Sequence, residues 1–260
     1  MGAREDIAFL VGSASRVELL QALADRPSRP TELAERCSCA RETAQRTLGE
    51  FVERGWVTKS EGQYQLTPGG SNVLDQYSEF SEVVRGAGRL ETFLTNLGTV
   101  AEGFPTHIYD EVTVTEASKT DPHAPIDRYL TFLGTDPVDS FEGVTPVVSR
   151  VYNEAATAII GPDTEMELVI DDSVLTVSET EYPEALQRAD QLEQFSLFLT
   201  PKDIDFGLAL VDGRAHVGAY DGNNNLVASV DGDSEPLLTW ARKVYQDYRQ
   251  SATPLERRFA

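Results

Sequence analysis

The sequence predicts a mixed chain of the α+β / α/β class, built in three parts. Apolar residues recur at helical spacing within the first 54 residues, and two short β-type runs around a glycine turn follow them. From about residue 105 onward, strand and helix signals alternate, as they do in an α/β sheet domain. We therefore predict a helix-and-hairpin domain over residues 1–68, a helical connector over 69–104 and an α/β domain over 105–260.

Charge is distributed unevenly between these parts. The chain carries a formal net charge of −21, yet residues 1–60 contain nine basic and nine acidic residues, so the whole excess lies in residues 61–260. Because phosphates repel carboxylates and attract Lys and Arg, a segment spared from the acidity is suited to approach nucleic acid. The acidity of the remainder favours a halophilic source over a merely acidic mesophilic one.

Three helices are expected in residues 1–60, the segment without net charge. The first begins near Arg16, and Thr31 is a suitable cap for a short second helix. A turn over Cys37–Ala40 precedes the third helix, which runs to about Arg54 and is ended by Gly55.

Two short strands follow the third helix, over residues 56–59 and 63–66. The turn Ser60-Glu61-Gly62 joins them and places a glycine where a positive φ is expected. Three helices followed by a hairpin, in this order, are typical of a winged helix-turn-helix.

The outward face of the third helix carries the side-chain types that read bases. Arg bonds guanine bidentately, Gln bonds adenine, and Thr or Ser holds phosphates. A recognition helix reads bases with its N-terminal residues, and this cluster lies there. Glu42 and Glu61 argue against a strongly basic surface, and a merely solvated polar face is the alternative. The predicted DNA contacts are Ser38, Arg41, Glu42, Thr43, Gln45, Arg46 and, in the wing, Lys59, Ser60 and Gln63.

Three segments carry a resemblance to archaeal winged helix-turn-helix transcription regulators. They are Ala40-Arg41-Glu42-Thr43-Ala44-Gln45-Arg46-Thr47-Leu48, Phe51-Val52-Glu53-Arg54-Gly55-Trp56-Val57 and Tyr64-Gln65-Leu66-Thr67-Pro68-Gly69-Gly70. The resemblance implies the fold and leaves the DNA target open. Ala40 departs from it, because such proteins often have a capping Ser or Thr there, so Ser38 is the alternative cap.

Cys37 and Cys39 are separated by one residue, which would strain a disulfide between them. A metal site would need further ligands, and no His lies near in sequence, so none is predicted. The pair is interpreted as small apolar fillers, with a redox-sensing thiol pair as the alternative.

The connector begins with a capping Thr67 and a first-turn Pro68. Apolar residues then follow at helical spacing, and Gly86-Ala87-Gly88 is expected to interrupt the helix. We predict that this helix joins two copies of the chain into a homodimer; packing on its own C-terminal domain is the alternative.

The C-terminal domain is expected to be one sheet with a meander and covering helices. Helices are predicted over 145–160, 183–192 and 234–249, and strands over 111–117, 166–170, 195–199, 206–211, 215–220 and 226–230. Here the chain resembles the regulatory domain of FilR-type (methanogenesis regulatory protein) transcription regulators, numerous in haloarchaea. The segments that carry the resemblance are Val112-Thr113-Val114, Ser118, Asp121-Pro122-His123-Ala124-Pro125, Arg128-Tyr129 and Gly143-Val144-Thr145-Pro146-Val147-Val148-Ser149.

That resemblance implies a sequence-specific DNA regulator whose C-terminal domain senses a molecule or oligomerises. His123 and Arg128 flank a Pro-bracketed loop and, with Arg150, could bind an anionic small-molecule effector. The alternative is a rigid loop whose His and Arg pair with local carboxylates. Asp171 and Asp172 are interpreted as a helix cap rather than as a cation site.

The leading prediction is a dimeric regulator that binds double-stranded DNA, needs no cofactor and is not an enzyme. One alternative is a protein-interaction module, which would present an apolar or buried third-helix face. The other is an enzyme with a phospholipase D-like half-domain, although Gly218 stands where the Lys of its His-x-Lys motif would follow His216. No apolar run approaches membrane-spanning length. Arg4, Glu5 and Asp6 precede only the short apolar run Ile7–Val11, so no signal peptide is predicted, and a cytoplasmic protein without membrane contact is expected.

Overall fold

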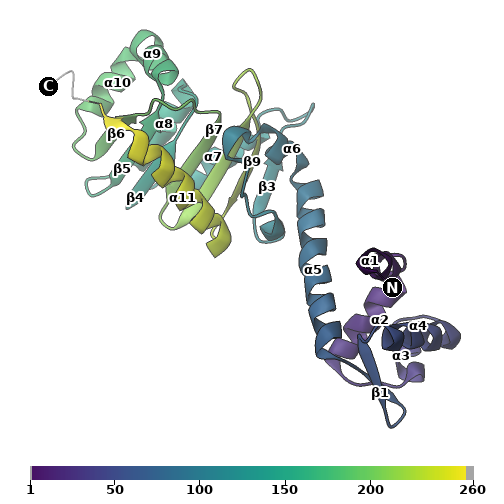
Figure 1. The fold of residues 1–260 in the computed structure, drawn as a ribbon. Coiled ribbons are helices and arrows are strands. Elements are labelled where there is room, and N and C mark those ends of the chain that lie inside the picture. The colour runs from purple at the N-terminus through teal and green to yellow at the C-terminus, as the bar shows by residue number, and fades with distance from the viewer. Residues whose placement is uncertain (1, 256–260) are drawn as a thin grey trace. The chain divides into compact units, whose positions relative to one another are not determined.

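The computed structural model describes residues 2–255 and confirms an α+β chain with an α/β sheet (Figure 1). The chain divides into two compact units, one up to Val83 and one from Val84 onward. Each unit has its own hydrophobic core, and each is described separately below.

The first unit is a winged helix-turn-helix preceded by one extra helix. Its elements are α1 (Ala3–Val11), α2 (Ala14–Asp25), α3 (Pro30–Arg36), α4 (Arg41–Glu53), β1 (Val57–Ser60), β2 (Gln63–Leu66) and the start of α5 (Pro68–Arg89). The predicted Thr31 cap is wrong: α3 begins two residues earlier, with Arg29 at the N-cap and Pro30 in the first turn, where its missing N–H is not needed. Thr67 caps α5 as predicted, because its hydroxyl accepts from the Gly70 amide at 3.0 Å.

The core of this unit is formed by the inward faces of α2, α3 and α4. Leu19, Leu20, Leu33, Leu48 and Phe51 are its fully buried side chains. The loop before α3 is tied to the wing, because the Ser28 and Tyr64 backbones exchange hydrogen bonds of 3.0 and 2.9 Å.

The wing turn has the expected backbone geometry. Glu61 and Gly62 have φ values of +50° and +79°, the left-handed pair required by the tight hairpin turn that matches strand twist. The strands β1 and β2 pair antiparallel, with Lys59 opposite Tyr64.

Helix α1 was not predicted, and an unusual contact fixes it. The guanidinium carbons of Arg16 and Arg54 lie 4.1 and 3.8 Å from the centroid of the Phe9 ring. Arg54 also pairs with Asp6 of α1 at 3.0 Å and with Glu50 of α4 at 2.8 Å. These contacts fasten α1 to the C-terminal end of α4.

The predicted interruption at Gly86-Ala87-Gly88 is wrong, since α5 continues to Arg89. In the second unit, a Cβ on Gly86 would lie 1.9 Å from the Thr106 carbonyl oxygen. Gly86 therefore serves a close backbone approach, which sequence alone does not distinguish from a helix break.

The second unit is built on one mixed eight-stranded sheet in the order β10-β6-β5-β4-β7-β8-β9-β3. Its strands are β3 (Thr113–Glu116), β4 (Ser140–Val144), β5 (Glu165–Ile170), β6 (Phe195–Leu199), β7 (Phe206–Val211), β8 (Arg214–Tyr220), β9 (Leu226–Gly232) and β10 (Thr253–Pro254). Its helices are α6 (Glu91–Asn96), α7 (Ala124–Leu133), α8 (Arg150–Ile159), α9 (Asp172–Glu181), α10 (Pro183–Asp190) and α11 (Glu235–Ser251), with short 3₁₀ turns at Gly98–Val100 and Thr106–Ile108. Strands β4, β5 and β6 run parallel, and β7-β8-β9 form the predicted antiparallel meander.

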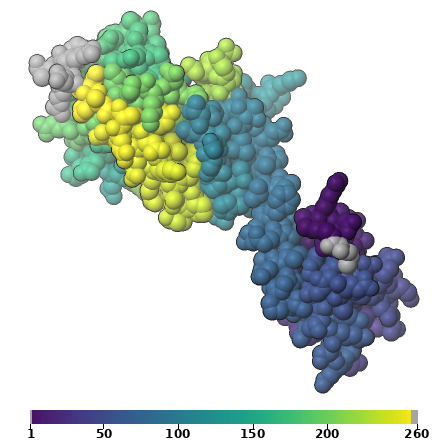
Figure 2. Space-filling view, in the orientation of Figure 1, coloured from purple at the N-terminus to yellow at the C-terminus, as the bar shows by residue number. Residues whose placement is uncertain are grey.

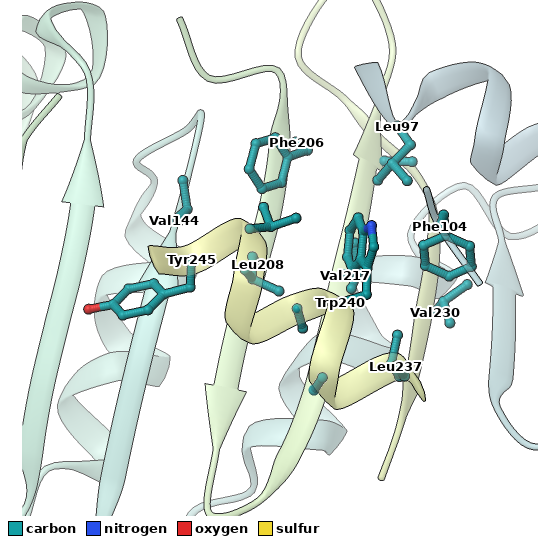
Figure 3. Packing of buried hydrophobic residues seen from close by; sticks show 14 of the residues in the cluster. Leu97, Phe104, Val144, Phe206, Leu208, Val217, Val230, Leu237, Trp240 and Tyr245 are labelled. Atoms are coloured by element: carbon teal, nitrogen blue, oxygen red, sulfur yellow. The ribbon is translucent and has the colours of Figure 1, made fainter. Parts of the chain in front are cut away.

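The two faces of this sheet are covered differently. Helix α11 crosses one face, where Leu237, Trp240 and Tyr245 pack on the strand residues Leu208 and Val217 (Figure 3). The space-filling view shows α11 as a continuous yellow band on the surface (Figure 2). The opposite face carries side chains packed with α7–α10, in two smaller clusters.

Several C-terminal elements differ from the predictions. The segment after Pro122, expected to be a loop, becomes α7, with Pro125 in its first turn. The helix predicted over 145–160 begins only at Arg150, capped by the Ser149 hydroxyl. Strand β4 was not predicted as an element. Helix α9 was expected only through its cap, and the Asp171 carboxylate caps it as predicted, accepting from the Val174 amide at 3.0 Å.

Within residues 2–255 no single helix has the length and apolar character needed to cross a bilayer. Helices α1 and α2 reach the required length and apolar character only when taken together, and they are bent by 93° relative to each other.

Candidate nucleic-acid interface

The N-terminal turn of α4 is exposed and lacks a side-chain cap. Ala40 is the N-cap residue, and it has no side chain that could accept a hydrogen bond. Ser38, the alternative cap, lies in the left-handed region with φ +48° and does not cap the helix. The first turn of α4 therefore offers exposed backbone amides beside its polar side chains.

The two faces of α4 differ as the helical period requires. Ala44, Thr47, Leu48 and Phe51 are buried against α2 and α3. The residues between them point outward, with Arg41, Glu42, Gln45 and Arg46 exposed and Thr43 half-buried. This polar outward face lacks the apolar or buried character that the protein-interaction alternative requires.

The arginines of this unit fall into two groups. Arg36 pairs with Asp25 at 2.6 Å, while Arg16 and Arg54 hold the Phe9 ring. By contrast, neither Arg41 nor Arg46 forms an ion pair or hydrogen bond with another residue in the described part of the chain. Their guanidinium groups are free to bind an external anion.

The wing formed by β1 and β2 carries one cation, Lys59. Lys59 is exposed near the turn, and its ammonium lies 5.3 Å from the centroid of the Tyr64 ring across the hairpin. Ser60 and Gln63 are exposed at the two sides of the turn. The exposed Glu61 at the tip places a negative charge next to them and limits any attraction for phosphates.

Two further arginines of this surface were not predicted. Arg26 and Arg29 are exposed in the loop between α2 and α3, and their side chains form no ion pair with any residue the structure describes. Ser28, between them, bonds the wing backbone at Tyr64. The Arg-Pro-Ser-Arg-Pro pattern of this loop is the sequence signal that could have found them.

Cys37 and Cys39 are half-buried thiols that pack against the first unit's core. Burial and the neighbouring Cys39 raise the pKa of the Cys37 thiol above its ordinary value. A raised pKa lowers the thiolate fraction on which oxidation depends, so the structure favours the apolar-filler interpretation.

The three candidate effector-binding residues in the second unit are differently engaged. His123 is exposed at the N-cap of α7. Arg128 bonds the buried Asp231 of β9 with two nitrogens, one of them Nε at 2.7 Å. Arg150 is exposed and bonds Glu154 at 2.7 Å, which raises the pKa of the guanidinium. Both arginines are thus paired with carboxylates, Arg128 with one from a distant strand and Arg150 with one on its own helix.

Comparisons with known proteins give family matches to both units. Residues 122–251 match the family described as the methanogenesis regulatory protein FilR1, middle domain. Residues 4–89 match the HVO_A0261 N-terminal domain family. No curated protein matches the chain.

Solved structures give only loose likenesses. TrmBL2, described as an archaeal chromatin protein with a novel mode of DNA binding, is 12% identical with a TM-score of 0.44, covering 97% of this chain and 100% of that one. The riboflavin-derivative dimethyltransferase RosA from Streptomyces davawensis is 14% identical with a TM-score of 0.24, covering 75% and 63%. The O-methyltransferase NcsB1 is 14% identical with a TM-score of 0.27, covering 76% and 67%. Values this low carry no functional argument.

Proposed function

This chain belongs to the family of the FilR1 middle domain, a family of regulatory proteins, and we propose that it is a transcription regulator that binds double-stranded DNA through its winged helix. The observation that carries the proposal is the pair of exposed arginines on α4, Arg41 and Arg46, whose guanidinium groups have no protein partner in the described chain. They flank Gln45 on one polar face. Arginine and glutamine at the start of a groove-binding helix supply bidentate contacts to guanine and adenine.

Charge supports the same surface. The segment that contains α4 and the wing carries no net charge over residues 1–60, whereas the rest of the chain carries −21. A duplex therefore meets the least repulsion at this unit. Arg26, Arg29 and Lys59 extend the unpaired cations beyond the recognition helix and are assigned to phosphate contacts.

The test is duplex binding by arginine variants. A binding site is first recovered by in vitro selection from random duplexes with the parent protein, and affinities are then measured by gel shift. We expect Arg41→Ala and Arg46→Ala each to weaken binding about 10- to 100-fold, in line with about 1–3 kcal/mol for a bidentate base contact. Circular dichroism checks that both variants stay folded.

Arg4→Ala is the matched control. It removes the same charge from α1, whose Asp6 pairs with Arg54 at the C-terminal end of α4. That end of α4 lies about 18 Å along the helix from Arg41. The control is expected to bind like the parent. If Arg41→Ala and Arg46→Ala also bind like the parent, or if selection recovers no preferred duplex, the proposal fails.

The proposal includes a homodimer formed through α5. Tyr77, Phe80 and Val84 recur at alternating spacings of three and four, the pattern of a coiled-coil seam. Phe80 is 65% exposed and Val84 54% exposed, so these two residues lie open in the single chain, whereas Tyr77 packs against the core of the first unit. Two half-sites read by two winged helices also multiply sequence specificity.

Sedimentation velocity tests the dimer. We expect the parent to sediment as a dimer and Phe80→Glu to sediment as a monomer, because a carboxylate in the seam would be buried without a partner. Asn72→Glu adds the same charge outside the stripe and should leave the dimer intact. A monomeric parent, or a dimeric Phe80→Glu variant, contradicts this part of the proposal.

A further inference from the structure

A cavity of about 1070 Å³ lies in the second unit, on the sheet face opposite α11. Strands β4–β8 supply its floor, and helices α7–α10 supply its walls. Apolar side chains from β5, β6 and α10 line most of it, including Met166, Leu168, Phe195, Leu197 and Leu186. Its volume lies at the upper end of the range of sites for drug-sized ligands. The face under α11 is, by contrast, filled by packed side chains.

Two glycines open the floor of this cavity. Gly207 of β7 and Gly218 of β8 are directly paired across the sheet. A Cβ on Gly207 would lie 3.1 Å from the Tyr220 ring, and a Cβ on Gly218 would lie 2.8 Å from a Leu226 methyl. The absence of both side chains lets the Tyr220 ring lie close to the sheet. Gly218, which stands where a phospholipase D-like motif would need Lys, thus makes room for neighbouring side chains by having none of its own.

Aromatic side chains from three elements meet around this floor. Tyr220 of β8 is hydrogen-bonded to Tyr152 of α8. The Tyr152 ring lies 5.3 Å from the ring of Tyr129 on α7, which in turn meets His216 of β8 edge-on at 4.9 Å. Burial raises the pKa of all three tyrosine hydroxyls, so they stay protonated and neutral.

His216 presents an unused polar atom to this group. It is 3% exposed, and its Nε2 has no hydrogen-bond partner among the described residues. Desolvation lowers the pKa of His216 to about 4, against the opposing charge of Asp231, so the ring is neutral at neutral pH. An unsatisfied buried nitrogen is costly, and a ligand that bonds it would recover that cost.

Charged groups are confined to the rim of the cavity. Those that line it are Arg150, Glu154, Glu181, Glu184 and Arg188, all exposed. Acidic residues outnumber basic ones there, and Arg150 is already bound to Glu154. The interior thus offers apolar surface, aromatic rings and neutral hydrogen-bonding groups, which suit neither an anion nor a cation.

Hydroxyl groups in the cavity are bonded to their own backbone. Thr145 donates to the Val147 carbonyl at 2.9 Å, and Ser178 donates to the Val174 carbonyl at 2.8 Å. With protonated tyrosines and a neutral His216 whose neighbouring Asp231 is held by Arg128, the cavity has the groups for binding but no activated nucleophile among the described residues. The geometry favours a ligand site over a catalytic one.

We propose that this cavity binds a neutral, mainly apolar small molecule that carries a hydrogen-bonding group for His216. The occupant would be the regulator's effector, and only that last step rests on the proposed DNA-binding function. The site differs from the anion site predicted from His123, Arg128 and Arg150, since only Arg150 lines the cavity, and it does so at the rim.

Two fluorescent probes with one skeleton test the proposal. N-phenyl-1-naphthylamine is neutral and carries one N–H; 8-anilinonaphthalene-1-sulfonate adds a sulfonate to the same rings. In molar KCl, which screens the chain's net charge, we expect saturable binding of the amine and at least about tenfold weaker binding of the sulfonate, because burying its charge is costly. Equal affinity for both probes, or no saturable binding of the amine, overturns the proposal.

Variants place the probe in the cavity. Ala189→Trp fills the wall that α10 contributes and should abolish saturable binding, while Gln187→Trp, on the same helix but outside the cavity lining, should bind like the parent. His216→Phe keeps an aromatic ring and should weaken binding about two- to tenfold through the lost hydrogen bond. Circular dichroism checks the fold of each variant. Parent-like binding by Ala189→Trp or His216→Phe overturns the proposal.

The two proposals fail separately. If the parent binds the neutral amine but no duplex DNA, the proposed function is wrong and the ligand site is still supported. If the parent shifts duplex DNA but does not bind the neutral amine, the ligand site is wrong and the proposed function is still supported.

Discussion

The two units of this chain differ in how many of their arginines are paired with carboxylates. In the second unit, Arg128, Arg150, Arg242 and Arg249 each contact a carboxylate within 4.0 Å. In the first unit, three arginines hold the structure together, while Arg41 and Arg46 on α4 stay exposed and unpaired within the described chain. An unpaired cation on a polar helix face contributes little to folding, which is why we propose an external partner for it.

The same contrast holds for where each unit keeps its unsatisfied polar groups. The first unit displays the unpaired Arg41 and Arg46 on its surface, where an external polyanion could reach them. The second unit keeps its unsatisfied His216 nitrogen buried in a residue that lines an apolar cavity. Four predictions probe this division between paired and unpaired groups.

The largest effect is expected at Arg128. Arg128→Ala leaves the carboxylate of Asp231, 5% exposed, buried without its partner, so we expect a loss of about 3 kcal/mol in the free energy of unfolding. Urea unfolding followed by Trp240 fluorescence in a Trp56→Phe background measures it. Adding Asp231→Asn to Arg128→Ala should restore part of the loss. A loss below about 1 kcal/mol would show that the pair is not a structural one.

The next effect separates two arginines at the ends of one helix. Arg54→Ala removes the ion pairs to Asp6 and Glu50 and the contact with Phe9, so we expect a loss of about 2 kcal/mol, discounted for the half-exposed carboxylates. Unfolding is followed by Trp56 fluorescence in a Trp240→Phe background. Arg41→Ala, at the other end of α4, should stay within about 0.5 kcal/mol of the parent. Similar losses of unfolding free energy in both variants would contradict the proposed difference between the paired Arg54 and the unpaired Arg41.

The third effect is a pH dependence of stability. The pKa of His216 is lowered to about 4 in the folded chain, from about 6.5 when unfolded. The unfolded state therefore binds the proton first, and stability falls as pH drops from 6.5 toward 4. Between pH 6.5 and 5 this histidine should cost roughly 1.5 kcal/mol.

Comparison with His216→Phe isolates the contribution of His216 from those of the carboxylates. Urea unfolding of both proteins across this pH range should show a steeper loss in the parent. Parallel curves would mean that His216 titrates normally, and that its ring is therefore hydrated rather than buried.

The smallest effect concerns the kind of contact that the unpaired arginines make with DNA. Arg46→Lys keeps the charge but loses the planar fork, so binding to the selected duplex should weaken by about 1 kcal/mol while its salt dependence stays unchanged. Arg29→Ala, assigned to a phosphate contact, should instead lower the slope of log affinity against log salt by about one. Gel shifts across a salt series measure both. The assignments would be exchanged if Arg46→Lys changed the slope and Arg29→Ala did not.

Local sequence patterns predicted most of the winged helix-turn-helix unit. Apolar spacing, the helix-ending Gly55 and the Glu61-Gly62 turn act over a few residues, so they identify α2, α4 and the wing without tertiary information. The same patterns placed Arg41, Gln45 and Arg46 on an outward face because the helical period separates them from Ala44 and Leu48. They missed α1, whose position depends on Arg54 and Phe9 meeting across the fold.

The tertiary structure alone decided what the second unit can bind. Which carboxylate Arg128 meets, and that Gly207 faces Gly218 across two strands, follow from sheet register, which joins residues far apart in the sequence. Gly86 was misjudged for the same reason, because its role is set by the distant Thr106 carbonyl. A cavity is a property of long-range packing, so His216, a plain strand residue in the sequence, became the centre of a candidate site only in the folded chain.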